Sequence, residues 1–328
     1  REGSMIIKSI AAGLLLALAS VSAAYAQQRN IEVVLFAGTS ALPVYVAKDK
    51  GFFEREGVNV NITPTPNSGF QMTNLVSGKF NIAGTAIDNL IAYMEGQGTG
   101  KVDREPDLIT IMGISSTELN IVAQPEYKTI ADLKGKDIAL DSPSTGFAFV
   151  LRNVLEKNGF GVNDTKWVPF GGTRERLNAL REKKAAAAMI TEPFTTQARA
   201  EGFSMIGEIV SVLGPYQANV QIANRPWAKA NEDTVVRYIR AMLNAIDWIY
   251  DPANKAESIK ILAMNAKIPE AAAAPSVNGV TSGQAAIDRK GAINAEGVRT
   301  VIALREKYGQ PQKKMGGLDK YYDATWYN

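Results

Sequence analysis

The chain has 328 residues, of which 46% are hydrophobic and 21% charged, so it is long enough for two domains with substantial cores and falls in the range of soluble globular proteins. Its 36 basic and 33 acidic residues leave a net charge of only +3, which argues against a nucleic acid as partner. It contains neither cysteine nor histidine, and this excludes disulfides, thiolate nucleophiles, Ser-His-Asp triads and histidine bases.

The N-terminal segment has the three parts of a secretory signal peptide. Lys8 supplies the charge, Ile10 to Val21 supply the apolar stretch, and an A-x-A sequence at positions 24–26 supplies the cleavage site. The apolar stretch is short for a bilayer span. We therefore expect residues 1–26 to be a vector remnant and a signal peptide, with cleavage after Ala26 and export of the mature protein to the periplasm.

From residue 30 onward, short apolar runs alternate with helical patterns. Strands are predicted at 31–36, 58–62, 80–84 and 108–114, with helices at 40–50, 70–77 and 87–95 between them. Ser40 is placed to cap the first of these helices, and Gly51 is placed to end it. Strands separated by helices at this spacing predict parallel pairing in an α/β sheet.

A second series of the same kind follows the segment 118–125. It has strands at 137–140, 166–168 and 186–190 and helices at 146–158, 173–183 and from 193, so the chain is expected to form two α/β lobes. Beyond residue 216 the pattern gives a strand at 218–223 and helices at 233–250, 253–266 and 295–308, which we expect to pack on the first lobe. The alanine-rich segment 270–275 indicates only a helix end or a loop. The predicted lobes are residues 27–121 with 217–328, and residues 122–216.

Several strand-to-helix loops carry small hydroxyl and glycine residues. In α/β sheets the carboxyl ends of the strands form the ligand crevice, and helix N-termini offer free N–H donors there. The alternative is that each hydroxyl only caps its own helix. The candidate ligand contacts from these loops are Thr39, Ser40, Ser68, Gly69, Thr85, Ser144, Thr145 and Gly146.

Three carboxylates lie near these loops. Asp88 is three residues after Thr85 and would suit a capping box. Glu192 precedes Pro193 and would suit a cap followed by proline in the first turn. Glu118, at the end of a predicted strand, has no such local role and is the strongest of the three as a ligand contact. No D-x-D-x-D-G metal loop is present, and no metal or cofactor is expected.

Five segments resemble the periplasmic solute-binding proteins of ABC importers, in the group that binds alkanesulfonates, taurine, nitrate and thiamine-pyrimidine (THI5-like) precursors. They are LPVYVAKDKGFFEREGVNV (42–60), FNIAGTAIDNLIAY (80–93), TIADLKGKDIAL (129–140), SPSTGFAFVLRNVLEKNGF (142–160) and AAMITEPF (187–194). The resemblance implies a bilobed, type II-like periplasmic-binding-protein fold with two crossover segments, near 118–125 and 213–218. It also implies a monomer that holds a small molecule between its lobes and docks on the transmembrane permease subunits. It adds Asn219 to the candidate contacts.

The function expected from these features is that of an exported binding protein for a small polar organic molecule, not an enzyme. A sulfonate or carboxylate is favoured, because helix N-termini and hydroxyls can hold an anion without lysine or arginine. A pyrimidine or thiamine precursor, which would donate to the three carboxylates, is the alternative ligand. Two further alternatives are a sensory receptor and a carboxylate-dependent enzyme in which Glu118 or Asp88 acts as a base. The predicted signal peptide argues against the enzyme.

Overall fold

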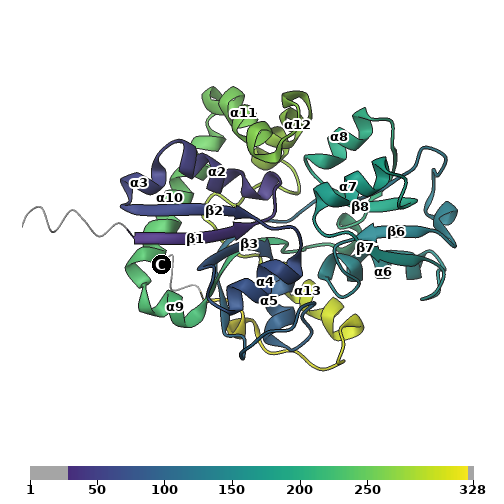
Figure 1. The fold of residues 1–328 in the computed structure, drawn as a ribbon, viewed down its shortest axis with the longest axis horizontal. Helices are drawn as coiled ribbons and strands as arrows, with labels where there is room; N and C mark the ends of the chain where they lie inside the picture. Colours follow the sequence, from purple (N-terminus) through teal and green to yellow (C-terminus); the bar gives the residue numbers. More distant parts are fainter. Residues whose placement is uncertain (1–28, 324–328) are drawn as a thin grey trace, which may run out of the picture.

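The computed structural model describes residues 29–323, which fold into two α/β lobes that lie side by side (Figure 1). Each lobe has a five-stranded sheet, in the orders β2-β1-β3-β10-β4 and β7-β6-β8-β5-β9. In both sheets the first three strands are parallel and the fourth is antiparallel to its two neighbours. The bilobed α/β fold class is therefore confirmed. The parallel pairing expected of strands that alternate with helices is confirmed for β1, β2 and β3 and for β6, β7 and β8. Strands β10 and β5 run antiparallel, because each enters its sheet from the opposite lobe.

The first lobe is built on the sheet of β1, β2, β3, β4 and β10. Its elements are β1 (Arg29–Leu35), η1 (Thr39–Ala41), α2 (Leu42–Asp49), α3 (Phe52–Arg55), β2 (Val58–Pro64), α4 (Ser68–Val76), β3 (Ile82–Ala86), α5 (Ile87–Met94), β4 (Leu108–Ser115) and β10 (Asn219–Asn224). Ile31 and Val33 of β1 pack in one apolar cluster with α2 and α10, while Val34 packs on the other face with α4 and α5. Burial on both faces explains why the strand is almost continuously apolar.

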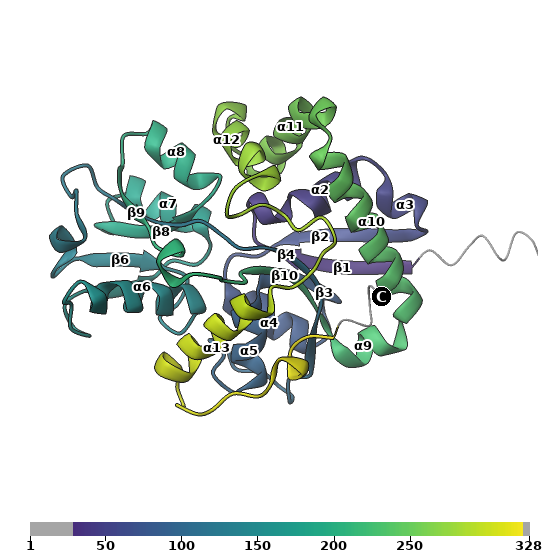
Figure 2. The ribbon, with the colours of Figure 1, turned by 180° about the vertical axis from the view of Figure 1, so that it is seen from behind.

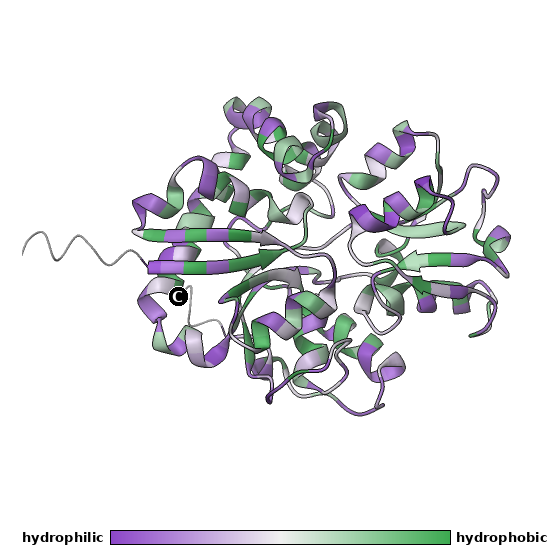
Figure 3. Cartoon of the chain, in the orientation of Figure 1, coloured by the Kyte–Doolittle hydropathy of each residue, from purple (hydrophilic) through white to green (hydrophobic). Residues whose placement is uncertain are grey.

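The second lobe contains the remaining strands. Its elements are β5 (Leu119–Ala123), η2 (Ile130–Leu133), β6 (Asp137–Leu140), α6 (Gly146–Lys157), β7 (Lys166–Pro169), α7 (Thr173–Arg181), β8 (Ala187–Thr191), α8 (Phe194–Ala200), β9 (Ser204–Glu208) and η3 (Ser211–Leu213). Because β5 pairs with β8 and β9, residues 119–121 lie in the second sheet rather than in the first lobe. In Figure 3 the inner strands β3 and β6 are mostly apolar, and hydrophilic residues lie along the outer helices.

The C-terminal part of the chain is helical. It contains α9 (Arg225–Ala230), α10 (Glu232–Tyr250), η4 (Pro252–Asn254), α11 (Lys255–Ala266), α12 (Glu270–Thr281), α13 (Ala295–Tyr308) and η5 (Leu318–Lys320). Helices α10 and α11 pack on α2 of the first lobe, as expected. Helix α12 instead reaches α8, and α13 lies between α5 and α6, so these two helices contact both lobes (Figure 2). Helix α12 also replaces the short helix end or loop expected at 270–275.

The predicted signal peptide lies outside the described residues. Within residues 29–323, no helix combines the length and the apolar character needed to cross a bilayer.

Candidate functional site

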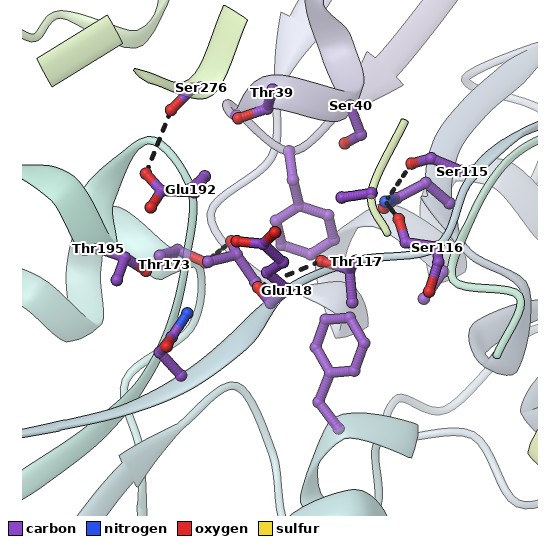
Figure 4. Close-up of a pocket in the computed structure, with 18 of the residues that line it drawn as sticks. Thr39, Ser40, Ser115, Ser116, Thr117, Glu118, Thr173, Glu192, Thr195 and Ser276 are labelled. Atoms are coloured by element: carbon purple, nitrogen blue, oxygen red, sulfur yellow. Dashed lines mark hydrogen bonds between the residues drawn. The ribbon is translucent and has the colours of Figure 1, made fainter. Parts of the chain in front are cut away.

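A cavity of about 590 Å³ lies between the two lobes, where the parallel strands of both sheets end. Its walls come from the segments after β1 and β3, the connection between β4 and β5, the starts of α6 and α7, the end of β8, and α12. Figure 4 shows hydroxyl and carboxylate side chains from these segments facing the same space. A crevice at the carboxyl ends of parallel strands is where α/β proteins bind small ligands.

The structure places most of the candidate contacts on the cavity wall. Those that line it are Thr39, Ser40, Thr85, Asp88, Glu118, Thr145, Gly146, Glu192 and Asn219, whereas Ser68, Gly69 and Ser144 do not. Two of the three outside the wall lie where the lobes meet. The Ser68 amide donates to both carboxylate oxygens of Asp141 at 3.3 Å, and the Ser144 carbonyl accepts from Arg305 at 2.8 Å.

The caps expected from Ser40 and from the Thr85–Asp88 capping box are absent. Helices η1 and α2 have no side-chain cap, so Ser40 does not cap them. Helix α5 has none either: the Thr85 hydroxyl accepts from Asn89 Nδ2 at 2.8 Å. Asp88 turns away from its own helix end to a buried arginine, because an ion pair in an interior holds a carboxylate more strongly than a cap does.

Asp88 forms the most buried ion pair of the site. Its side chain is 2% exposed and that of Arg305 is 0% exposed. Arg305 Nε lies 2.6 Å from Asp88 Oδ1, and Nη2 lies 2.7 Å from Oδ2. The Gly146 amide, at the N-terminus of α6 in the other lobe, also donates to Oδ2 at 2.6 Å. The first turn of α6 is therefore occupied by a carboxylate of the protein itself.

A second backbone contact joins the two lobes. The Gly172 amide donates to the Pro66 carbonyl at 2.8 Å, which joins the start of α7 to the loop before α4. Gly171 has a φ of +84°, and a Cβ there would lie 2.5 Å from the Pro66 oxygen. Only glycine fits this close approach of two backbones. The lobes are thus in direct contact at two places.

Glu118 lies in the connection between β4 and β5, not at a strand end as expected. Its half-buried side chain lies among the labelled side chains of Figure 4. Among residues 29–323, its carboxylate has no hydrogen-bond or ion-pair partner. Burial raises the pKa of Glu118, and the negative charges of Glu192 and Glu208 raise it further. Glu118 therefore presents a free acceptor to the cavity.

The two neighbouring carboxylates are already bonded. Glu192 accepts from the hydroxyls of Thr196 and Ser276, each at 3.1 Å, and the latter bond joins α12 to the second lobe. Glu208 accepts from the amides of Val210 at 2.7 Å and Ser211 at 2.9 Å. In the described part of the chain, no three acidic side chains are grouped closely enough to hold a metal ion.

Sequence reasoning missed the cations of the site. Arg176 of α7 lines the cavity and is 4% exposed, and the exposed Arg199 of α8 lines it as well. Burial lowers the pKa of Arg176 to about 10, although the charges of Asp141 and Glu175 oppose this effect. The run TRER at 173–176 resembles a solvated helix face, so the sequence carried no signal that one of its arginines is buried.

Residues 39–256 match the family model described as "NMT1/THI5 like". The match covers more than half of the chain. The chain belongs to the NMT1/THI5-like family. The family expected from the five sequence segments is thereby confirmed.

Two curated relatives are similar in sequence to this chain over part of their length. YtlA of Bacillus subtilis (strain 168), named for a binding role, is 27% identical over 221 residues, which cover 65% of this chain and 64% of YtlA. A Brachyspira hyodysenteriae protein, named for a periplasmic binding role in an ABC transporter, is 25% identical over 167 residues, covering 51% of this chain and 46% of that protein. The chain thus spans less than two thirds of the length of either relative.

Solved structures share the fold at low sequence identity. A protein from Bordetella bronchiseptica RB50 superposes with a TM-score of 0.75 at 20% identity and covers 92% of this chain and 96% of its own. The alkanesulfonate-binding protein SsuA from Xanthomonas axonopodis pv. citri has a TM-score of 0.69 at 19% identity, covering 86% and 93%. The desulfurization enzyme DSZB has a TM-score of 0.65 at 13% identity, covering 92% and 98%. The periplasmic-binding-protein fold is confirmed, and an enzyme also uses it.

Proposed function

We propose that this NMT1/THI5-like chain is the solute-binding component of an ABC importer, working in the periplasm. The observation that carries this proposal is the cavity of about 590 Å³ whose polar walls come from both lobes. A ligand that contacts both lobes binds the closed arrangement better than an open one, so it closes the cleft by shifting the population. The closed protein then docks on the permease subunits. The name of YtlA supports the binding role, and the name of the Brachyspira protein supports the place in an ABC transporter.

The charges of the cavity bear on the ligand class. A sulfonate or carboxylate was favoured because helix N-termini could hold it, but at α6 the Asp88 carboxylate takes that place. Glu118 offers an acceptor without a partner, and an anion beside it would meet repulsion from a second carboxylate, Glu192. We therefore propose a ligand that donates hydrogen bonds or positive charge to Glu118, such as an amine or an aminopyrimidine.

The apolar part of the wall is consistent with a ring-shaped ligand. Phe36 follows β1 in the first lobe and Phe147 lies in the first turn of α6 in the second, and both line the cavity. Aromatic side chains from opposite walls can cover the two faces of a flat ring. The pyrimidine alternative meets both requirements, the donors and the ring.

One observation favours a second function. Glu118 lies in a cleft and has a raised pKa, which is a property of carboxylate bases in enzymes. The fold is shared with DSZB, an enzyme. We rank the enzymatic function second, because the pKa of a carboxylate is also raised in any binding site that excludes water.

A thermal-shift screen tests both functions. The panel contains alkanesulfonates, nitrate, carboxylates, amines and aminopyrimidines, and each hit is recovered after long incubation and weighed by mass spectrometry. A ligand at a hundred times its dissociation constant should add about 2.7 kcal/mol to the free energy of unfolding. We expect hits among the amines and aminopyrimidines, recovered unchanged. A hit recovered with altered mass would put the enzyme first, and stimulation of a reconstituted permease by the loaded protein would separate an importer from a sensory receptor.

A further inference from the structure

Arg176 is a buried cation whose bonding is incomplete. Its Nη2 donates to the Thr173 hydroxyl at 2.6 Å, but its Nε has no hydrogen-bond partner among the described residues. The side chain lines the cavity and only 4% of the residue is exposed. A buried arginine normally uses its donors, because leaving one unbonded after it is withdrawn from water costs free energy.

A second buried donor on the cavity wall also lacks a hydrogen-bond partner among the described residues. Thr195 of α8 is 1% exposed and lines the cavity, and its hydroxyl has no partner among the residues described. Thr195 and Thr173 lie on the same side of the cavity in Figure 4. Two unbonded donors on one wall, a guanidinium N–H and a hydroxyl, suit an anionic or acceptor group of a ligand.

The donors of this wall are not paired with the acceptor Glu118. No ion pair within 4.0 Å joins Arg176 to Glu118 in residues 29–323. Their electrostatic neighbours also differ, since Asp141 and Glu175 act on Arg176, whereas Glu192 and Glu208 act on Glu118. The cavity wall therefore carries a cation, Arg176, and a carboxylate, Glu118, that are not paired with each other.

We propose that the ligand is an ampholyte, a small molecule that presents a donor or positive charge to Glu118 and, on another part of the molecule, an anionic or acceptor group to Arg176 and Thr195. This inference rests on the proposed function and narrows it, because neither a simple amine nor a simple sulfonate uses both Glu118 and Arg176. The planar fork of arginine fits two acceptor oxygens, so a carboxylate is the simplest group for that end.

Matched ligand sets test the inference by calorimetric titration of the full chain. One set is γ-aminobutyrate, butylamine and butyrate; the other is an aminopyrimidine carboxylate, the aminopyrimidine and the pyrimidine carboxylate. In at least one set, the ampholyte should bind tenfold or more tightly than either half, the gain from one charge-assisted hydrogen bond. If neither ampholyte binds, or if a half binds as tightly as its ampholyte, the inference is overturned.

Two variants separate this inference from the proposed function. Arg176→Gln should reduce the affinity for the ampholyte to that for the amine-bearing half and leave the latter unchanged, while Arg176→Lys should keep part of the preference. The ratio of the two affinities is measured within each variant, so a partial loss of folding does not affect it. If the amine half binds in wild type and the ratio is unaffected by Arg176→Gln, Arg176 plays no part and the proposed function stands. If only the acid halves bind, the proposed donor ligand fails as well.

Discussion

Asp88 and Arg305 form a buried bidentate ion pair between residues 217 positions apart in the chain, with oxygen–nitrogen distances of 2.6 and 2.7 Å. The pair fixes α13 to α5 at the edge of the cavity. Because the same carboxylate accepts from the Gly146 amide, it also holds the first turn of α6 in the second lobe. The pair therefore links the C-terminal helices to the closed position of the lobes.

Removing Arg305 should strongly destabilise the protein. Arg305→Met leaves the Asp88 carboxylate buried without its partner, and breaking such a pair costs about 3–5 kcal/mol. Arg299→Met on the same helix is the control, because Arg299 pairs with Glu296 at the surface and exposed pairs contribute less than about 1 kcal/mol. Urea unfolding of both variants measures the difference. Equal losses of unfolding free energy in the two variants would show that the buried pair stabilises the protein no more than the surface pair does.

A methyl group at residue 146 should hold the lobes apart. The Cβ of Gly146→Ala would lie 2.4 Å from the Asp88 Cγ, so the start of α6 must move away from α5. Overpacking of this kind costs about 1–3 kcal/mol, which should weaken ligand binding about fivefold or more. Small-angle scattering should give a larger radius of gyration than in wild type. Gly207→Ala, where a Cβ meets nothing within 4 Å, should change neither quantity.

Glu95 should make stability depend on acid pH. Burial by itself would raise the pKa of its carboxyl, but hydrogen bonds from Lys313, Lys320 and Tyr321 lower it from 4.5 to about 2. A folded-state pKa below the unfolded one gives stability that is present above about pH 4.5 and is lost as the pH falls toward 2. Urea unfolding of wild type and Glu95→Gln should therefore differ at pH 6 and converge near pH 2. A difference that stays constant over this range would contradict the assignment.

The affinity for a donor ligand should rise with pH. Burial and then Glu192 and Glu208 raise the pKa of Glu118, so the ligand-free site keeps its proton to a higher pH than an ordinary glutamate. A donor ligand binds the ionised form of Glu118, so binding releases the proton. Calorimetric titration in two buffers with different heats of ionisation measures the number of protons released. The stability of the ligand-free protein should depend on pH in the opposite direction to the affinity. Its free energy of unfolding should fall as the pH rises through the raised pKa of Glu118, because the folded state then loses the proton that it holds more tightly. An affinity that falls over that range would speak against a donor ligand.

The sequence predicted those helices and strands that have both a clear apolar periodicity and recognisable end signals. The bounds of α13 agree with the expected 295–308, because a periodic apolar face follows a residue that caps the helix, Asn294. Helix α12 was missed, because its alanine-rich sequence has little periodicity and contains Pro275. Strand β9 was missed as well, since it pairs only with a strand far away in the chain.

The site was predictable only where a residue lacked a local role. Glu118 was singled out because no helix end nearby could use it, and among residues 29–323 its carboxylate is the one left unbonded at the cavity. Asp88 was assigned to a capping box, because its partner Arg305 lies in a distant helix that the sequence cannot place. Arg176 was not considered, since a charged helical run gives no indication of which arginine is buried.

The most direct test of the account is the affinity of the strongest donor-bearing hit for wild type, Glu118→Gln and Glu126→Gln, measured by calorimetric titration. Glu126 is exposed and does not line the cavity, so Glu126→Gln makes the same chemical change away from the site. We predict that Glu118→Gln weakens binding tenfold or more, the loss of one hydrogen bond to a charged group, while Glu126→Gln binds as wild type does. Equal affinities for all three proteins would contradict the central claim that the ligand is held through Glu118.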